Sequence, residues 1–318
     1  MIERFEELVT VFGGDGFIGR YVCEHLFRSG VRVRVASRDP RNSFFLQPLA
    51  QVGQFGFVEA DITDRGSVAR AFEGASAAVN LVGVFGRRMH EVHVDGARNI
   101  AEAARDRGLN ALVHISAIGA DPNSPSNYGR TKREGEDAVR TAFPDATIVR
   151  PSLAFGAEDD LTNRFAAMAR LPVLPVIAAG RNFQPVYVRD LGRAIAMAAL
   201  EPERFGGKIY EIGGPRVMSM VELHRAILEI TGQRTDLLPM PDLFGDLLSR
   251  LGWLPGAPLT RDQWLMLGQD NVASGEYPGL EAFGIKATPL AAVGTEWLGR
   301  FHKGGKLAGR RINLTATS

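Results

Sequence analysis

The sequence predicts an α/β protein, with a doubly wound parallel sheet and a smaller C-terminal α/β lobe. Three observations lead to this prediction. Apolar segments of strand length alternate with amphipathic helical segments over about the first 150 residues, as in parallel sheets with right-handed helical crossovers. A glycine-spaced turn follows the first strand. Polar or glycine residues follow several later strands, at the edge where such sheets bind their ligands.

Hydrophobic periodicity divides the first half of the chain into short elements. Residues 31–36 alternate apolar and basic side chains, which is the two-residue period of a strand covered on one face. Residues 121–127 form a loop rich in Pro, Ser and Asn that caps the following helix. In chain order, the expected elements are strand 8–12, helix 17–29, strand 31–36, strand 54–59, a helix ending at 72, strand 77–82, helix 90–107, strand 111–116, a helix carrying Tyr128, and strand 146–150.

The turn after the first strand carries Gly13, Gly16 and Gly19. Glycines at this spacing allow a tight turn, close approach of the backbone to a pyrophosphate, and close packing of the helix on the sheet. The amides of the first helical turn, which includes Phe17 and Ile18, would then face the phosphate oxygens. The pattern alone is a weak signal, and it gains weight from a Tyr-x-x-x-Lys pair later in the chain.

The end of the second strand indicates which dinucleotide binds. An acidic residue about twenty positions beyond the glycine turn binds the ribose of NAD, whereas an arginine there accommodates the 2′-phosphate of NADP. This chain has Ser37 and Arg38 at that point, and Asp39 comes one or two positions late. A guanidinium can pair with a phosphate through two hydrogen bonds. The sequence therefore favours NADP; the alternative is that Arg38 is a solvated loop residue.

Residues after the third and fourth strands complete the candidate cofactor site. Asp61 could accept a hydrogen bond from the adenine amino group while Ile62 packs on the ring; the alternative is that Asp61 caps a helix. Leu81 and Gly83 end the fourth strand, where a glycine lets the backbone pass close to the cofactor ribose.

Tyr128 and Lys132 are four residues apart, so on a helix they share one face. A lysine ammonium there can bond the nicotinamide ribose and lower the pKa of the tyrosine. The phenol could then exchange a proton with a carbonyl or an alcohol. Ser116, at the end of the fifth strand, could hold the same oxygen. Cofactor contact and catalysis are separate hypotheses, because the pair could hold a nucleotide without transferring a proton.

After Pro151 the chain is broken into short pieces by prolines, with helices expected at 189–200 and 220–231. We expect a dinucleotide-binding domain over residues 1–155. A smaller lobe is expected over 156–300, with some of its strands returning to the main sheet, followed by a basic tail over 301–318.

Two features of this second half could contact a partner. Residues 242–253 carry a stripe of large apolar side chains at helical spacing, namely Leu243, Phe244, Leu247, Leu248 and Leu251. Such a stripe most often belongs to a core, and the alternative is docking on a partner or a membrane surface. The last twenty residues carry five basic side chains and no acidic one, which suits a solvated tail or an arm on a partner or anionic lipid.

Composition excludes several classes of function. A net charge of +1 argues against nucleic-acid binding, which needs a basic surface. Cys23 is the only cysteine, which points to a reducing compartment. His90 and His93 lie one helical turn apart with no third ligand nearby, so no metal site is expected. No apolar run is long enough to span a membrane, and we expect a bacterial cytoplasmic chain or an already processed one.

Taken together, the motifs resemble those of the extended or atypical short-chain dehydrogenase/reductase superfamily, which has a Rossmann fold. The resemblance rests on the glycine turn, Arg38, the Tyr128/Lys132 pair and residues 149–156. More narrowly, several stretches resemble the nucleotide-binding accessory subunit of respiratory complex I, called alpha subcomplex subunit nine in mitochondria. These stretches are residues 80–83, 114–116, 165–168, 184–188, 259–262 and 278–290.

The resemblance implies a specific role. In that family an NADPH is held tightly as a structural element, and the subunit packs on the peripheral arm near the membrane and the quinone site. It implies that the three glycines, Arg38, Ser116, Tyr128, Lys132 and the Pro151 region contact NADPH. Other complex I subunits would be the partners, and the chain would lie peripherally on the cytoplasmic side of a bacterial inner membrane, or on the matrix side in mitochondria.

Three hypotheses about function follow. The first is a non-catalytic, NADPH-holding accessory subunit of complex I (NADH:quinone oxidoreductase). The second is an active NADP-dependent reductase or epimerase that acts on a small carbonyl compound or a nucleotide sugar, with Tyr128 as acid/base. The third is a binding module that senses NADP(H) and reports its occupancy to a partner.

Overall fold

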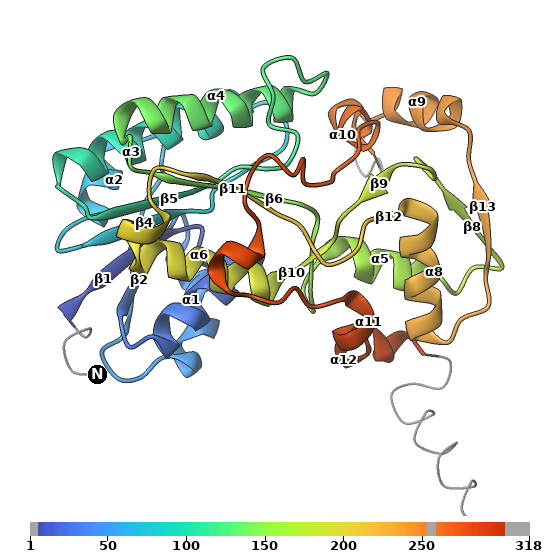
Figure 1. The fold of residues 1–318 in the computed structure, drawn as a ribbon, viewed down its shortest axis with the longest axis horizontal. Helices are drawn as coiled ribbons and strands as arrows, with labels where there is room; N and C mark the ends of the chain where they lie inside the picture. The colour runs from blue at the N-terminus through green and yellow to red at the C-terminus, as the bar shows by residue number, and fades with distance from the viewer. Residues whose placement is uncertain (1–5, 253–258, 303–318) are drawn as a thin grey trace, which may run out of the picture. The chain divides into compact units, whose positions relative to one another are not determined.

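The computed structural model describes residues 6–252 and 259–302 (Figure 1). The chain forms two compact units. The first comprises Met1–Pro151, Val188–Ile212 and Ala273–Lys286, and the second comprises Ser152–Tyr187, Gly213–Val272 and Ala287–Ser318. Every residue of the candidate cofactor site lies in the first unit.

The first unit contains a sheet of seven strands in the order β11-β6-β5-β4-β1-β2-β3, and all of its pairings are parallel. This confirms the predicted doubly wound fold. Residues beyond 156 contribute β11, which pairs with β6 at one edge. The strands are β1 Leu8–Phe12, β2 Arg32–Ser37, β3 Phe55–Glu59, β4 Ala77–Asn80, β5 Ala111–Ile115, β6 Thr147–Pro151 and β11 Ile209–Ile212.

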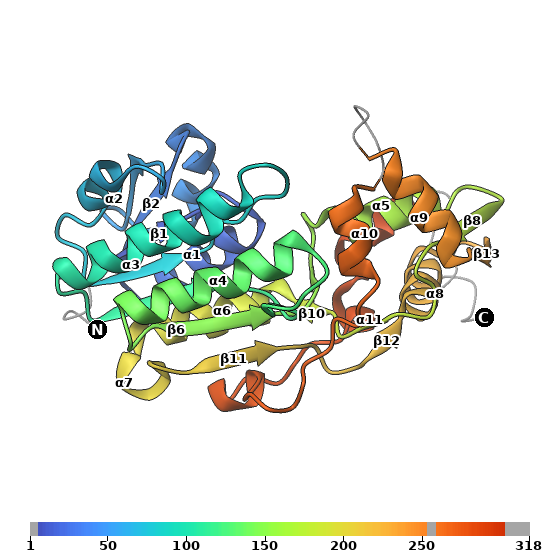
Figure 2. The same ribbon diagram turned by 90° about the horizontal axis from the view of Figure 1, so that it is seen from above.

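Helices cover both faces of this sheet. The helices α2 (Arg65–Ala71), α3 (Ala97–Asp106) and α4 (Asn127–Ala142) lie on one face, and α1 (Phe17–Arg28) and α6 (Val188–Leu200) lie on the other (Figures 1 and 2). The strands between them carry mainly apolar residues, and β1, β4 and β5 are buried along their whole length. Such continuous burial is expected of parallel strands covered on both sides. Shorter helical segments of this unit are η2 Pro40–Leu49, α7 Pro202–Phe205 and η4 Leu280–Phe283.

The helix expected over 90–107 is present, because residues 89–106 are helical without a break, but it contains a π-helical segment that the sequence did not predict. The segment Glu91–Gly96 (η3) is a π-helix, and the α-helix α3 starts only at Ala97. A π-turn widens the backbone by one residue per turn, and such turns occur frequently at functional sites. Here the wide turn brings the His93 carbonyl against Gly135 of α4, where a Cβ would lie 2.2 Å from that oxygen. Only a glycine on α4 permits this contact.

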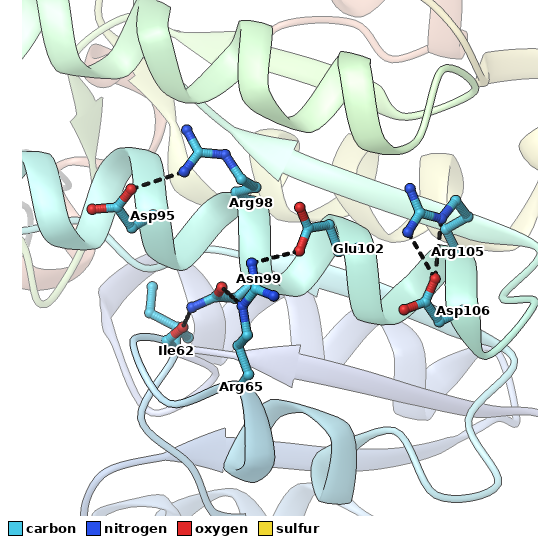
Figure 3. Close-up of polar contacts among 8 residues, drawn as sticks. All are labelled: Ile62, Arg65, Asp95, Arg98, Asn99, Glu102, Arg105 and Asp106. Carbon is cyan, nitrogen blue, oxygen red and sulfur yellow. Dashed lines mark hydrogen bonds and ion pairs between the residues drawn. The ribbon is translucent and has the colours of Figure 1, made fainter.

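Polar contacts on α3 hold the loop that follows β3 (Figure 3). The Asn99 amide donates to the carbonyl of Ile62 at 3.0 Å, and its oxygen accepts from Arg65 Nε, also at 3.0 Å. Arg65 also pairs with Glu102 at 2.8 Å. The backbone next to Asp61, one of the candidate site residues, is thereby fixed to two helices.

The second unit consists of small two-stranded sheets and helices around its own core. Phe155, Phe183, Leu223 and Trp297 belong to that core. The helix α8 (Met220–Thr231) begins with a capping box between Ser219 and Glu222. The remaining elements are β7 Ala154–Phe155, α5 Asp160–Met168, β8 Val173–Val176, β9 Asn182–Phe183, β10 Val186–Tyr187, β12 Met218–Ser219, β13 Asp236–Pro239, α9 Asp242–Arg250, α10 Arg261–Leu267, α11 Leu290–Val293, α12 Thr295–Leu298 and η5 Gly299–Phe301.

The apolar stripe of α9 does not form a core. Leu243 and Leu247 are 78% and 61% exposed, and the helix instead buries Gly245 and Ser249. Gly245 packs so closely on Trp264 of α10 that a Cβ there would lie 2.3 Å from the indole ring. The helix is therefore held by its small residues, and its large apolar side chains face outward.

Two expectations concern residues that the structure does not describe. Trp253, at the end of the apolar stripe, and residues 303–318 of the basic tail lie outside the described ranges. Across the described residues, none of the helices combines the length and the hydrophobicity that crossing a membrane requires.

A buried ion network fixes α4 to the sheet. Arg150 of β6 donates two hydrogen bonds to the Glu136 carboxylate of α4, at 2.8 and 2.7 Å. It also pairs with Glu211 of β11 at 3.4 Å, and all three side chains are at most 7% exposed. Glu211 accepts from the backbone of Ser274 at 2.6 Å, so one network joins four segments of the unit. No local sequence pattern indicates this network, because its members come from distant elements.

Replacing Arg150 by Met should strongly destabilise the protein, because two buried carboxylates lose their cation. We expect the free energy of unfolding in urea to fall by about 3–5 kcal/mol. Arg105→Ala serves as the control, since Arg105 forms an exposed pair with Asp106, and it should cost no more than about 1 kcal/mol. Equal losses in the two variants would contradict this account.

Candidate functional site

The candidate site lies at the carboxyl ends of the parallel strands. β1 runs into the glycine turn, β2 ends at Ser37, and Ser116 directly follows β5. β4 ends at Asn80, two residues earlier than expected, so Leu81 and Gly83 lie in the loop after it. Because parallel strands end at one edge, residues from distant parts of the sequence meet there.

The glycine turn brings α1 against the end of β1. Gly13 has a φ of +74°, in the left-handed region that favours glycine, and its N–H donates to the Ala36 carbonyl of β2. A Cβ on Gly19 would lie 2.3 Å from the Gly13 oxygen, so no larger residue fits there. Gly16 is the N-cap of α1 and has no side chain to cap the helix. The first-turn amides, near Phe17 and Ile18, are thus available to an anion.

Ser37 and Arg38 differ in their surroundings. The Ser37 hydroxyl is buried and has no hydrogen-bond partner among the described residues, whereas Arg38 is exposed. Asp39 is engaged elsewhere, because its Oδ1 accepts from both the backbone and the Nε of Arg41. A buried hydroxyl next to an exposed guanidinium suits a bound polar group that contacts both.

Contacts with neighbouring residues fix the positions of the Asp61 and Ile62 side chains. Asp61 Oδ1 accepts from the backbone N–H and the hydroxyl of Thr63, and the backbone hydrogen bond holds the pKa of Asp61 below its usual range. The N-cap of α2 is Asp64, so Asp61 is not the helix cap considered as an alternative. Ile62 is buried against Gly96, where it packs as a core residue.

Tyr128 and Lys132 come together beside Gly83, and Ser116 directly follows Ile115, whose carbonyl Lys132 contacts. Lys132 is buried, its Nζ donates to the Ile115 carbonyl at 3.0 Å, and it lies 5.8 Å from the centre of the Tyr128 ring. A Cβ on Gly83 would lie 3.3 Å from the same Nζ. The Ser116 hydroxyl is buried and has no partner among the described residues. The Pro151 carbonyl, at the end of β6, accepts from the N–H of Ile118 in the loop after Ser116.

Burial sets the pKa values of this group. It raises the pKa of Tyr128 to about 12 and lowers that of Lys132 to about 8, against a smaller opposing effect of Glu136. The expectation that Lys132 lowers the pKa of Tyr128 is therefore not met in this structure. Burial of the phenol dominates, and Tyr128 stays protonated at neutral pH.

Two buried histidines beside Lys132 were missed as site residues. Burial and the nearby Lys132 charge lower the pKa of both His93 and His114 to about 3, so both are neutral. His114 Nδ1 faces the Asn80 amide at 3.1 Å, and His114 Nε2 has no partner among the described residues. Their spacing in the sequence gave no signal, since the sheet and the π-turn bring them together.

These features fit a dinucleotide. The glycine turn packs the start of α1 against the end of β1 with no room for a Cβ at Gly19, and it presents helix amides at that edge. Among the described residues, the buried hydroxyls of Ser37, at the end of β2, and Ser116, directly after β5, have no hydrogen-bond partner. Buried polar groups without partners are rare, and a missing ligand explains them.

The fold and this site define a nucleotide-binding α/β protein. A family model described as NAD dependent epimerase/dehydratase matches residues 9–213, which is more than half of the sequence. The chain belongs to this family of NAD(P)-binding proteins, within the extended short-chain dehydrogenase/reductases. The resemblance predicted from the motifs is thereby confirmed.

Two named relatives are similar to this chain over most of its length. The chain is 34% identical over 302 residues to NADH dehydrogenase (ubiquinone) 1 alpha subcomplex subunit 9, mitochondrial, of Rattus norvegicus, covering 92% of this chain and 80% of the rat protein. It is also 32% identical over 243 residues to a ceramide reductase of Caulobacter vibrioides, covering 74% of each chain. The relatives therefore include both a complex I subunit and a protein named as a reductase.

Solved structures agree on the fold. The NADPH-dependent quinone oxidoreductase QOR2 of Escherichia coli, solved with NADPH, has a TM-score of 0.73 at 18% identity and covers 91% of this chain and 99% of its own. The UDP-glucose 4-epimerase of Thermus thermophilus, solved with NAD, has a TM-score of 0.67 at 20% identity, with 92% and 98% covered. One holds NADPH and the other NAD, so the fold itself does not select between the cofactors.

Replacing Lys132 by Met should change how stability depends on pH. Burial lowers the pKa of Lys132 from 10.5 to about 8, so between these values the unfolded chain binds the proton that the folded chain has lost. The stability of the wild type relative to Lys132→Met should therefore rise between pH 8 and 10.5, by up to about 3 kcal/mol. Urea unfolding of both proteins across this range measures it. A difference that does not vary with pH would contradict a buried, destabilised ammonium.

Proposed function

We propose that this chain holds NADPH as a structural group and serves as a non-catalytic accessory subunit of a complex I-type NADH:quinone oxidoreductase. One observation carries the proposal. The similarity to the rat complex I subunit extends over 302 residues, whereas the general family model ends at residue 213. The shared sequence thus includes most of the second unit, which family membership alone does not require.

The cofactor would be held by the residues at the strand ends. In this proposal the amides after Gly13, Gly16 and Gly19 bind the pyrophosphate, and Ser37 and Arg38 bind the 2′-phosphate of the adenosine ribose. Asp39 is occupied by Arg41, which leaves Arg38 as the charged group at that point and favours NADPH over NADH. Further contacts would come from Asp61, Ile62, Leu81, Gly83, Ser116, Tyr128, Lys132 and Pro151.

The charge state of the group around Tyr128 is compatible with holding a nucleotide without turning it over. Lys132 directs its ammonium at the Ile115 carbonyl, and Tyr128 keeps its proton at neutral pH. Both groups can donate hydrogen bonds to ribose or carboxamide oxygens in that state. Tyr128, with a pKa of about 12, is not a general base near neutral pH.

The partners in this proposal are other subunits of the peripheral arm, on the cytoplasmic side of a bacterial inner membrane. The exposed apolar face of α9 supports a contact between the second unit and a neighbouring subunit or the membrane surface. Native electrophoresis of solubilised membranes tests the assembly. The chain should migrate with NADH:quinone reductase activity, and its recovery only as a free protein would count against the proposal.

Charge reversal at Arg38 tests the cofactor. Arg38→Glu should weaken NADPH binding at least tenfold, about 1.4 kcal/mol, and change NADH affinity less than threefold, since only NADPH carries the 2′-phosphate. Arg105→Ala removes an exposed arginine at the end of α3 that pairs with Asp106, and it should leave NADPH affinity within threefold of the wild type. Calorimetry on cofactor-stripped protein gives both affinities. Equal effects on the two cofactors would refute the role of Arg38.

A second candidate function is an active NADP-dependent reductase. It is favoured by the juxtaposition of Ser116, Tyr128 and Lys132 and by the relative named ceramide reductase. In that reaction the nicotinamide would supply a hydride to a carbonyl carbon, Tyr128 would give its proton to the carbonyl oxygen, and Ser116 would hold that oxygen.

The two functions predict different results for Tyr128→Phe. If the chain is a reductase, carbonyl-dependent oxidation of NADPH should fall at least a hundredfold in the variant, because the phenol is the proton donor. If the chain is an accessory subunit, the wild type shows no such oxidation and the variant retains its NADPH. The absorbance of the reduced nicotinamide and the nucleotide content of denatured protein distinguish the two.

A further inference from the structure

Phe85 covers one face of Tyr128. Its ring stacks on the phenol with 4.7 Å between centroids and 17° between planes. Phe85 lies in the loop after β4 and is itself 55% exposed, so its ring forms part of the surface beside Tyr128. The His93 ring meets the same phenol edge-on at 5.3 Å. Tyr128 is thus bordered by aromatic groups from the loop and from the π-turn.

A chain of hydrogen bonds holds the loop in this position. The N–H of Val84, next to Phe85, donates to His93 Nε2 at 3.0 Å. Since Nε2 accepts, the neutral imidazole carries its proton on Nδ1 and donates it to the Thr131 hydroxyl at 2.9 Å. That hydroxyl donates to the Tyr128 carbonyl at 3.2 Å. The loop that carries Phe85 and the helix turn that carries Tyr128 are therefore joined through one buried histidine.

The hydrogen bonds through His93 stay the same over the physiological pH range. Burial and the charge of Lys132 lower the pKa of His93 to about 3, so its acceptor nitrogen is retained across the whole physiological range. The contact of Gly135 with the His93 carbonyl sets how closely the π-turn approaches α4. The backbone next to Phe85 is thus tied through the His93 side chain to a π-turn that packs closely on α4.

We propose that Phe85 is a specificity-determining residue of the Tyr128 site: its ring excludes hydroxyl-rich molecules from the phenol and admits only a compound with an apolar surface beside its carbonyl group. A phenyl ring offers no hydrogen bonds to replace those that a sugar hydroxyl loses on leaving water. An apolar carbonyl compound loses none and gains contact with the exposed face of the ring. The inference rests on the NADPH binding and on the reductase candidate proposed above, and it assigns a selecting role to a residue outside the glycine, arginine and tyrosine motifs.

Phe85→Ala tests the inference in the NADPH-loaded full chain. Acetylation of Tyr128 by N-acetylimidazole, a small polar reagent, should become at least fivefold faster, as measured by mass spectrometry of the Tyr128 peptide. Phe85→Trp should restore protection because it returns an aromatic ring. Phe57→Ala is the matched control. Phe57 lies in β3, away from the site, and its side chain is 47% exposed. Its ring centroid lies 5.2 Å from that of Phe44. In Phe57→Ala, Tyr128 should react at the wild-type rate.

A second readout concerns substrates directly. The measured quantity is the rate of NADPH oxidation with glyceraldehyde divided by the rate with decanal. This ratio should be at least fivefold higher in Phe85→Ala than in the wild type. If neither protein oxidises NADPH, the acetylation rates decide. The inference is overturned if Phe85→Ala keeps its NADPH and its thermal stability and yet Tyr128 is acetylated no faster, or if Phe57→Ala gives the same increase. A wild-type protein without NADPH would instead reject the proposed function.

Discussion

The close approach of α1 to the end of β1 is the constraint on which the candidate site depends. Gly19 lies against the Gly13 carbonyl with no space for a Cβ, and Gly13 adopts a left-handed φ. This contact directs the helix amides to the strand edge, where Ser37 and Ser116 bury hydroxyls without partners among the described residues. A larger residue at position 19 would move the helix away from the sheet, and the phosphate-binding geometry would be lost.

The opposite side of the site depends on burial of charge. Lys132 is buried close to two neutral histidines, and the Glu136–Arg150–Glu211 network lies one helical turn further along α4. Burying ionised groups is costly unless each finds a partner, so these residues hold α4 in one position on the sheet. The same burial keeps Tyr128 protonated and Lys132 close to losing its proton. This charge state suits hydrogen bonding to a nucleotide, and it leaves the phenol able to serve as a proton donor if a carbonyl compound reaches it.

The NAD dependent epimerase/dehydratase family model matches residues 9–213, whereas the similarity to a complex I subunit extends over 302 residues. The relatives diverge in what they are named to do, although each is similar to this chain over most of its length. In the second candidate function the residues around Tyr128 carry the proton transfer, whereas the glycine turn would hold the cofactor in either function. Phe85 and His93 lie beside Tyr128, on the loop and the π-turn that face α4.

The sequence by itself determined the parallel sheet, the glycine turn and the placement of Arg38, Ser116, Tyr128 and Lys132 after strands of that sheet, because period and spacing are local properties of the chain. It also led to the family. Only the tertiary structure decided that residues 91–96 form a π-turn, that α9 faces its leucines outward, and that Phe85, His93 and Tyr128 meet. Those outcomes depend on contacts such as Gly135 with His93 and Gly245 with Trp264. Each contact joins residues from different elements, and a local pattern cannot report which distant surface a helix will pack against.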